Sequence, residues 1–132
     1  MIGIADASHQ ESSPDAHDPL VSALSCSLVG KTETVMIARG SLAHRIYGRD
    51  RAEEQFLCNY GLSPNYREKI EAGGLRITGT DRNGDARLIE RTDHPFFIAT
   101  LFLPQFSSTA ANPHALLIAF LRAAASERPF RH

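Results

Sequence analysis

The 132-residue chain has no tryptophan, only two cysteines and no excess of charge of either sign. Its 14 lysines and arginines nearly balance its 15 aspartates and glutamates, which gives a formal net charge of -1. A polyanion would therefore meet no attractive field, and we predict neither a nucleic-acid partner nor a membrane partner. A chain of this length is the size of one domain and can bury a workable core.

Long hydrophobic runs are also missing. The longest apolar stretch, Phe96 to Leu103, is far shorter than the roughly 20 residues that span a bilayer. Residues 1–19 lack the basic start and apolar centre of a secretory signal, so we predict a cytoplasmic protein. In that compartment a disulfide is not expected, and the apolar surroundings of Cys26 and Cys58 predict two buried thiols.

Metal-binding patterns are absent as well. The six histidines show no paired ligand spacing, so we predict no metal site and no cofactor. The segment Asp81 to Asp85 resembles a calcium loop only superficially, because the glutamate that should close such a loop at position twelve is missing. Its Asn83-Gly84 pair is instead a common signal for a tight β-hairpin.

The chain divides into an extended polar arm at residues 1–19, a folded unit at residues 20–126 and a frayed tail at residues 127–132. The predicted fold class is α/β, with α+β as the alternative, and consists of a mixed sheet with an antiparallel hairpin and three helices. Helices are expected after Ser41, Ser63 and Asn112, which are all residues that cap helix starts. The expected strands are Leu20–Leu28, Thr32–Ile37, Glu53–Asn59, the hairpin strands Leu75–Thr80 and Ala86–Arg91, and Phe96–Phe102, the last covered on both faces.

Three motifs in the second half of the chain carry a family resemblance. They are Gly-Gly-Leu-Arg-Ile-Thr-Gly-Thr-Asp at 73–81, Asp-His-Pro-Phe-Phe-Ile-Ala-Thr-Leu-Phe at 93–102 and Pro-His-Ala-Leu at 113–116. In this order they resemble the end of the class I glutamine amidotransferase domain of CTP synthases. Upstream, residues 1–6, 24–30 and 58–61 resemble a smaller bacterial group, the CTP synthase C-terminal region-related proteins. The resemblance implies the C-terminal half of such a domain.

The same resemblance implies that the glutaminase chemistry is lost. The family uses a cysteine on a glycine-flanked elbow, a histidine that activates it and a glutamate that orients the histidine. Neither Cys26 nor Cys58 has flanking glycines. Where the family has Phe-His-Pro-Glu, this chain has Phe-Leu-Pro-Gln, so Leu103 replaces the base and Gln105 replaces its orienting carboxylate. We therefore predict a protein that does not hydrolyse glutamine.

A remnant pocket is expected where the altered turn meets the end of the Glu53–Asn59 strand. Its predicted lining is Cys58, Asn59, Tyr60, Leu103 and Gln105. Cys58 with Glu54 as a base is a candidate catalytic pair, but a buried strand end is the favoured interpretation of Cys58, and a solvated edge is the favoured interpretation of Glu53 and Glu54. His94 is expected to make a structural hydrogen bond rather than to act in catalysis.

Two classes of function remain open. One is a module without glutaminase activity that binds a small molecule or a protein through the remnant pocket. The other is an enzyme of specialised metabolism that uses the altered pocket for a different reaction. Half of a sheet also leaves strand edges unpaired, so we predict either a homodimer or a complex with a separately encoded N-terminal half, with the homodimer favoured.

Overall fold

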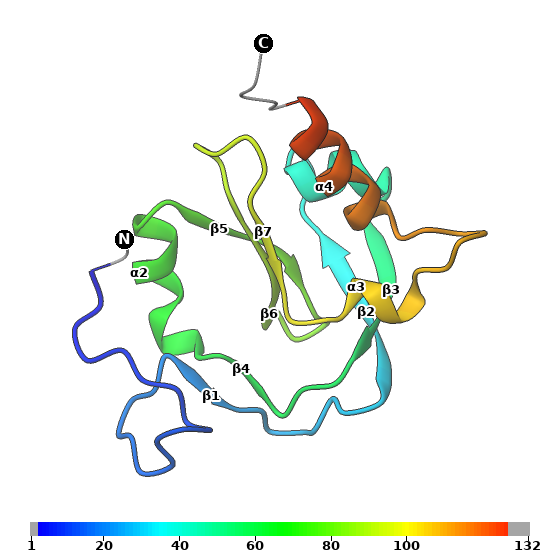
Figure 1. Cartoon of the computed structure of the whole chain (residues 1–132). Coiled ribbons are helices and arrows are strands. Elements are labelled where there is room, and N and C mark those ends of the chain that lie inside the picture. The colour runs from blue at the N-terminus through cyan, green and yellow to red at the C-terminus, as the bar shows by residue number, and fades with distance from the viewer. Residues whose placement is uncertain (1–2, 127–132) are drawn as a thin grey trace.

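The computed structural model describes residues 3–126, which form a curved five-stranded sheet and a smaller two-stranded ribbon (Figure 1). The large sheet has the order β3-β2-β5-β6-β7, the ribbon pairs β1 with β4, and neighbouring strands in both are antiparallel. The strands are β1 (Val21–Ala23), β2 (Lys31–Ile37), β3 (Arg51–Phe56), β4 (Tyr60–Leu62), β5 (Leu75–Thr80), β6 (Ala86–Arg91) and β7 (Ile98–Thr100).

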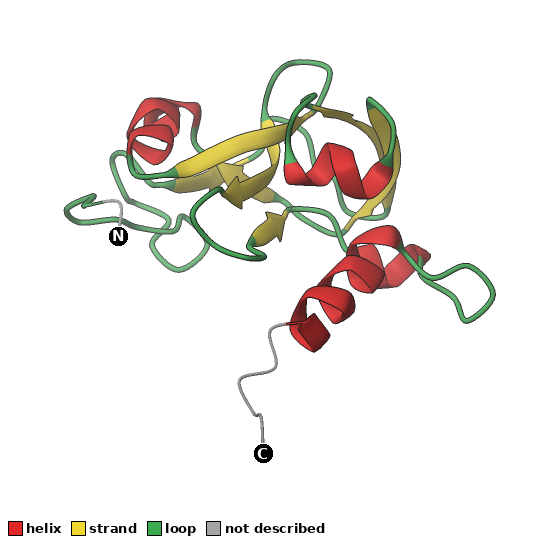
Figure 2. Cartoon of the chain, turned by 90° about the horizontal axis from the view of Figure 1, so that it is seen from above, coloured by secondary structure: helices red, strands yellow, loops and turns green. Residues whose placement is uncertain are grey.

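Helices lie at the ends and on the faces of this sheet (Figure 2). They are α1 (Leu42–Tyr47), the 3-10 turn η1 (Pro64–Tyr66) that leads into α2 (Arg67–Ala72), the short α3 (Pro104–Ser107) and α4 (Ala115–Ser126). The helices predicted after Ser41 and Ser63 are confirmed. The third predicted helix is also present, but it begins at Ala115 rather than directly after Asn112, and the short α3 was not predicted. Ser41 caps α1 by accepting a hydrogen bond from His44 N at 3.0 Å, and Gly48 ends it with a left-handed φ of 68°.

The predicted hairpin is confirmed with the expected strand bounds. The Asp81 carboxylate organises its turn, because Asp81 Oδ1 accepts hydrogen bonds from Asn83 N and Asp85 N, each at 2.9 Å. Gly84 has a φ of 89°, a conformation that favours glycine. Together with the mixed helix and sheet content, the hairpin bears out the predicted fold class, and the antiparallel pairing fits the α+β alternative.

Two apolar clusters hold the sheet. The larger one includes Val35, Phe56, Leu88, Phe102 and Leu116, and it joins the sheet to α1 and α4. The rings of Phe56 and Phe102 meet edge to face at 5.9 Å between centroids. The smaller cluster is built on Tyr66, Ile70 and Leu75, and packs η1 and α2 against the hairpin. The fold is thus held by helices on each side of the sheet.

The Phe96–Phe102 prediction is wrong in two respects. Only Ile98–Thr100 form a strand, and this strand, β7, lies at the edge of the sheet. It is not covered on both faces, because Ala99 is exposed. The apolar character of this segment therefore does not come from burial between two layers.

The Leu20–Leu28 prediction and the buried-thiol prediction also need correction. Only Val21–Ala23 pair as a strand, and the chain beyond runs beside residues 58–59 through hydrogen bonds from Leu24 N to Asn59 O and from Leu28 N to Cys58 O. Because this segment lies at the surface, Cys26 is exposed, while Cys58 is half-buried.

The remaining fold predictions concern the two ends of the chain. Residues 3–19 contain turns and one isolated bridge from His9 to Val21, with no helix or strand. The predicted frayed tail at 127–132 lies outside the described residues. Within residues 3–126, no helix has both the length and the apolar character needed to cross a membrane.

Candidate functional site

Cys58, Asn59 and Tyr60 line one cavity of about 390 Å³ at the junction of β3 and β4. Leu57, Gly61 and Leu62 continue the same wall, and Leu101 adds an alkyl group from the chain that follows β7. The structure therefore brings together three of the five predicted pocket residues. The cavity combines apolar walls with a thiol, an amide and a phenol, which is a composition suited to a small ligand.

The N-terminal arm supplies the opposite wall, which sequence reasoning missed. His9, Glu11 and Val21 line the cavity, and the His9 ring packs against Tyr60 with 5.5 Å between centroids. His9 Nδ1 accepts a hydrogen bond from Glu11 N at 3.1 Å, so the neutral ring carries its proton on Nε2. No local pattern links an arm residue to Tyr60, about fifty residues away, so the sequence carried no signal for this contact.

Leu103 and Gln105 lie at the start of α3 and are not among the residues that line this cavity. Leu103 N donates a hydrogen bond to Gln55 O of β3 at 2.9 Å. The altered turn is thus fixed against β3, and Gln105 is exposed beside it. Leu101, two residues before Leu103, is the point where this segment reaches the cavity.

Glu54 is buried, with 2 % of its surface exposed, so the predicted solvated edge is wrong for this residue. Its Oε1 accepts a hydrogen bond from Tyr47 Oη at 2.6 Å and lies 2.8 Å from His114 Nε2. Burial, and then the hydrogen bond to Glu54, raise the pKa of Tyr47 well above the usual tyrosine range. Glu53, on the opposite face, is exposed as predicted.

The hydrogen bond at the other ring nitrogen of His114 indicates which nitrogen carries the proton. His114 Nδ1 accepts a hydrogen bond from Leu116 N at 3.1 Å, so the neutral ring must carry its proton on Nε2 and donate it to Glu54. His114 N in turn donates to Ser108 Oγ at 2.9 Å. The ring therefore caps the start of α4 and ties it to β3, and Glu54 is engaged in this link rather than with Cys58.

His94 makes the structural contact that was predicted. Its Nδ1 accepts a hydrogen bond from Phe96 N at 3.2 Å, and its ring lies against Phe97. A local bond of this kind orders the entry to β7 and gives no catalytic geometry.

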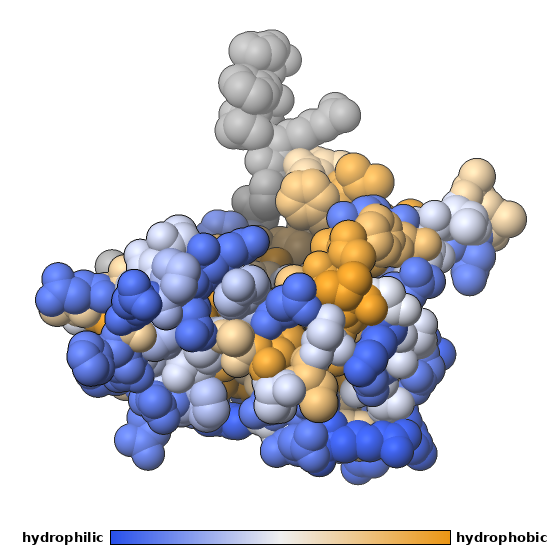
Figure 3. All heavy atoms as spheres, turned by 90° about the horizontal axis from the view of Figure 1, so that it is seen from below, coloured by the Kyte–Doolittle hydropathy of each residue, from blue (hydrophilic) through white to orange (hydrophobic). Residues whose placement is uncertain are grey.

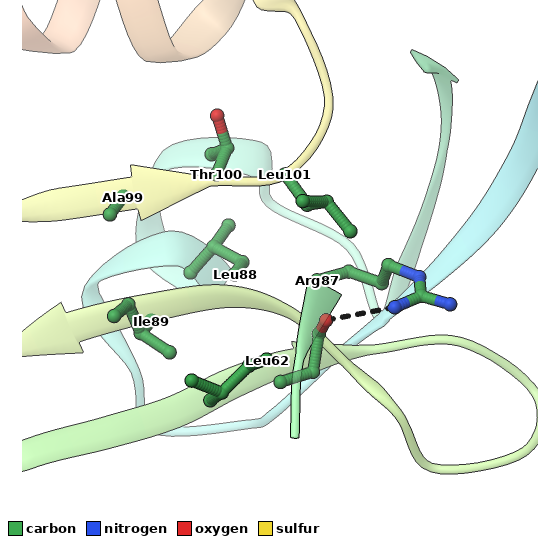
Figure 4. A pocket seen from close by; sticks show the side chains of 8 residues that line it. Leu62, Arg87, Leu88, Ile89, Ala99, Thr100 and Leu101 are labelled. Carbon is green, nitrogen blue, oxygen red and sulfur yellow. Dashed lines mark hydrogen bonds between the residues drawn. The ribbon is translucent and has the colours of Figure 1, made fainter. Parts of the chain in front are cut away.

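A second, apolar cavity of about 160 Å³ lies between β4 and the neighbouring strands β6 and β7. Figure 4 shows the side chains of Leu62, Ile89 and Leu101 around it, with the Arg87 guanidinium directed away. Arg87 is buried and pairs with Asp81 Oδ2 at 2.9 Å, which anchors the hairpin turn. In Figure 4 the one charged side chain that is drawn, Arg87, points away from this cavity, whose lining is mainly apolar.

Comparison with known proteins agrees with this fold. No family model matches the chain. The chain is 32% identical to CTP synthase of Methanopyrus kandleri over 98% of its own length and 26% of that protein. It is 29% identical to CTP synthase of Saccharolobus solfataricus over 96% of its length and 25% of that protein. The chain thus spans about a quarter of these relatives.

A solved structure shows the same fold. The glutaminase domain of the Trypanosoma brucei CTP synthase, solved with bound acivicin, matches 98% of this chain and 55% of that one with a TM-score of 0.88 and 22% identity. Fold and sequence together define a glutamine amidotransferase-like domain. Within that class, the chain belongs to the CTP synthase-related proteins, and it corresponds to a C-terminal part of their glutaminase domain.

Proposed function

We propose that this chain is a CTP synthase-related module that does not hydrolyse glutamine and that binds a small molecule or a protein partner through the cavity at Cys58, Asn59 and Tyr60. The observation that carries the first part is the Phe-Leu-Pro-Gln turn. Leu103 and Gln105 occupy the positions at which the family resemblance expects a histidine and a glutamate. An alkyl group cannot accept a proton, and a neutral amide cannot stabilise an imidazolium.

The free-energy cost of losing these catalytic groups supports complete loss of glutamine hydrolysis. Removing one member of a nucleophile, base and orienting group already costs several kcal/mol of transition-state stabilisation, and such losses are shared rather than additive. Here the base and its orienting group are both replaced. The Leu103 backbone is held by its hydrogen bond to Gln55 O, which fixes the Phe-Leu-Pro-Gln turn against β3.

A glutaminase assay tests this part of the proposal. Purified protein is incubated with glutamine and ammonia is measured, with the Methanopyrus kandleri CTP synthase as the positive control. We expect no release above a heat-inactivated sample. Turnover that stays proportional to the amount of this chain through repurification would overturn the proposal.

The binding part rests on the cavity, whose walls come from the arm and from β4. A fragment screen by protein NMR would detect ligands as shifts of the Asn59 and Tyr60 amides. We expect Tyr60→Phe to weaken binding without lowering the melting temperature. Unlike the hydroxyls of Tyr47 and Tyr66, that of Tyr60 makes no hydrogen bond within residues 3–126. Glu68→Gln, on the exposed face of α2, is the control and should leave binding unchanged. Shifts that spread over the whole sheet, or none at all, would contradict a site here.

A second candidate function is an enzyme that uses the altered pocket for a different reaction. One observation favours it: the cavity places the Cys58 thiol among the same lining residues as the His9 imidazole and the Glu11 carboxylate, which are groups that serve as nucleophile and base. Alkylation by iodoacetamide tests it. A Cys58 that reacts faster than the exposed Cys26, and that slows in the His9→Gln variant, would support activation. Equal rates for both cysteines would remove this candidate.

A further inference from the structure

The outer side of β7 carries backbone hydrogen-bonding groups that no strand engages within residues 3–126. Arg91 N donates to Phe97 O at 3.2 Å and Leu101 N donates to Arg87 O at 2.9 Å, so Phe97 and Leu101 point their backbone groups toward β6. Ile98 and Thr100 alternate with them and therefore direct their N–H and C=O groups away from the sheet. This edge is open to a further strand.

One apolar hollow lies beside β7, and another lies beside the segment that precedes it. The cavity of about 160 Å³ lies along Ala99 and Leu101 on the β4 side. A second one, of about 340 Å³, lies between the segment that enters β7 and α4, lined by His94, Pro95, Phe96, Phe120, Ala123 and Ala124. A strand added at this edge would find apolar surface for the alternating side chains of both its faces.

β7 is short, which is one of the ways in which edges are protected, but it has none of the other features that discourage pairing. Natural edge strands are commonly protected by charges, by proline or by a bulge. Ile98, Ala99 and Thr100 are uncharged, and Pro95 and Pro104 lie outside β7. Nearby, Phe120 and Leu121 of α4 are 53% and 62% exposed, which extends the apolar surface beyond the strand. Figure 3 shows apolar atoms gathered in the middle of the face seen from below.

We propose that a second copy of this chain docks at this edge, with the two β7 strands antiparallel about a two-fold axis at Ala99. An antiparallel edge is complementary to itself under such an axis, because reversing the strand repeats the same order of donors and acceptors. In this register Ile98 lies opposite the second copy's equivalent of Thr100, and the two residues exchange backbone hydrogen bonds. The exposed apolar face of α4 supplies the further area that a stable interface of at least about 1,000 Å² requires.

Sedimentation equilibrium at micromolar concentrations tests the proposal with the whole chain. We expect a dimer, and we expect Ala99→Lys to weaken it by about tenfold or more, which corresponds to about 1.4 kcal/mol, because a lysine at the edge carries charge into the apolar contact. Ala99 is exposed, so the change does not disturb the core. The matched control is Ala110→Lys in the exposed loop before α4, which should leave the dimer unchanged.

Hydrogen exchange gives a second readout that does not depend on a variant. The Ile98 and Thr100 amides should become more protected as protein concentration rises, whereas the exposed Arg51 amide should not. A monomer at all concentrations, or a dimer that is indifferent to Ala99→Lys, would overturn the proposal. So would a different polypeptide that copurifies in fixed proportion and protects the same two amides.

Discussion

β3 and β7 are the two outer strands of one sheet. Of these two, only β3 is bonded to a helix through a buried side chain within residues 3–126. Glu54 on its inner face is bonded to Tyr47 of α1 and to His114 at the start of α4. On its outer side Gln55 O already accepts a hydrogen bond from Leu103 N. The exposed side chains of β3 include Arg51 and Glu53, which are charges of the kind that protect an edge.

β7 differs from β3 in its length, its charge and the bonding of its outer backbone groups. It is three residues long, it carries no charge, and its outer backbone groups have no strand beside them in the described chain. The entry to β7 is ordered by the local bond of His94 to Phe96 N. The difference shows that the β3 edge is tied to the rest of the chain through Glu54 and Gln55, while the outer side of β7 meets no strand within residues 3–126.

The buried Glu54 is the strongest test of the β3 side. We expect Glu54→Ala to lower the free energy of unfolding by about 3 kcal/mol, because it leaves the Tyr47 hydroxyl and the His114 N–H buried without a partner. Glu33→Ala is the matched control, since Glu33 lies directly opposite Glu54 on β2 but is exposed. Urea denaturation measures both. Similar losses in the two variants would show that the link from Glu54 to α1 and α4 does not stabilise the sheet.

Three histidines, His9, His94 and His114, each accept a backbone N–H from two residues ahead. His114 is bonded to β3 and His94 precedes β7, so these two allow the edges to be compared with one substitution. We expect His114→Leu to cost about 1–3 kcal/mol, because Glu54 loses a buried donor and Leu116 N loses its acceptor. The same change at His94, which is exposed and bonded to Phe96 N, should cost much less. Both are read from denaturation curves. If His94→Leu were the more damaging variant, β7 rather than β3 would be the anchored edge.

Local chemistry explains which parts of the fold could be predicted. The caps at Ser41 and Ser63 and the turn at Asn83-Gly84 depend on neighbours within a few residues, so their patterns were sufficient. Burial of β7 was predicted wrongly because an apolar run can be covered by this chain or left for another surface, and its composition is the same in both cases. The exposed Phe120 and Leu121 of α4 illustrate the same ambiguity.

In the candidate site, too, local features could be predicted and contacts between distant residues could not. The alternation of β3 placed Glu54 and Phe56 on one face, and the apolar neighbours Ala52 and Phe56 were a signal that Glu54 is buried. The partner of Glu54, however, lies 60 residues away at His114, and the partner of Tyr60 lies in the arm at His9. Such contacts depend on how the elements pack, and one sequence holds no pattern for them.

The smallest expected effect compares the aspartates that precede the two edges, Asp50 before β3 and Asp93 before β7. Arg39, and then His44, hydrogen bond the Asp50 carboxylate and hold its pKa below the usual aspartate range. Arg91 lowers the pKa of Asp93 in the same direction. Both groups are exposed, so solvent screens most of the interaction and the effect on stability is small.

The sign of the pH dependence follows from the direction of these shifts. A carboxyl whose pKa is lower in the folded protein stabilises it above the ordinary aspartate pKa of about 3.9, and this contribution is lost as the pH falls toward the folded pKa. We expect Asp50→Asn to remove part of the stability lost between neutral pH and the acidic range, and Asp93→Asn to remove less, because Asp50 has two partners and Asp93 has one side-chain donor. NMR titration of the carboxyl groups should give a lower pKa for Asp50 than for Asp93. An Asp50 that titrates at or above the ordinary value would show that the entry to β3 is no better ordered than the entry to β7.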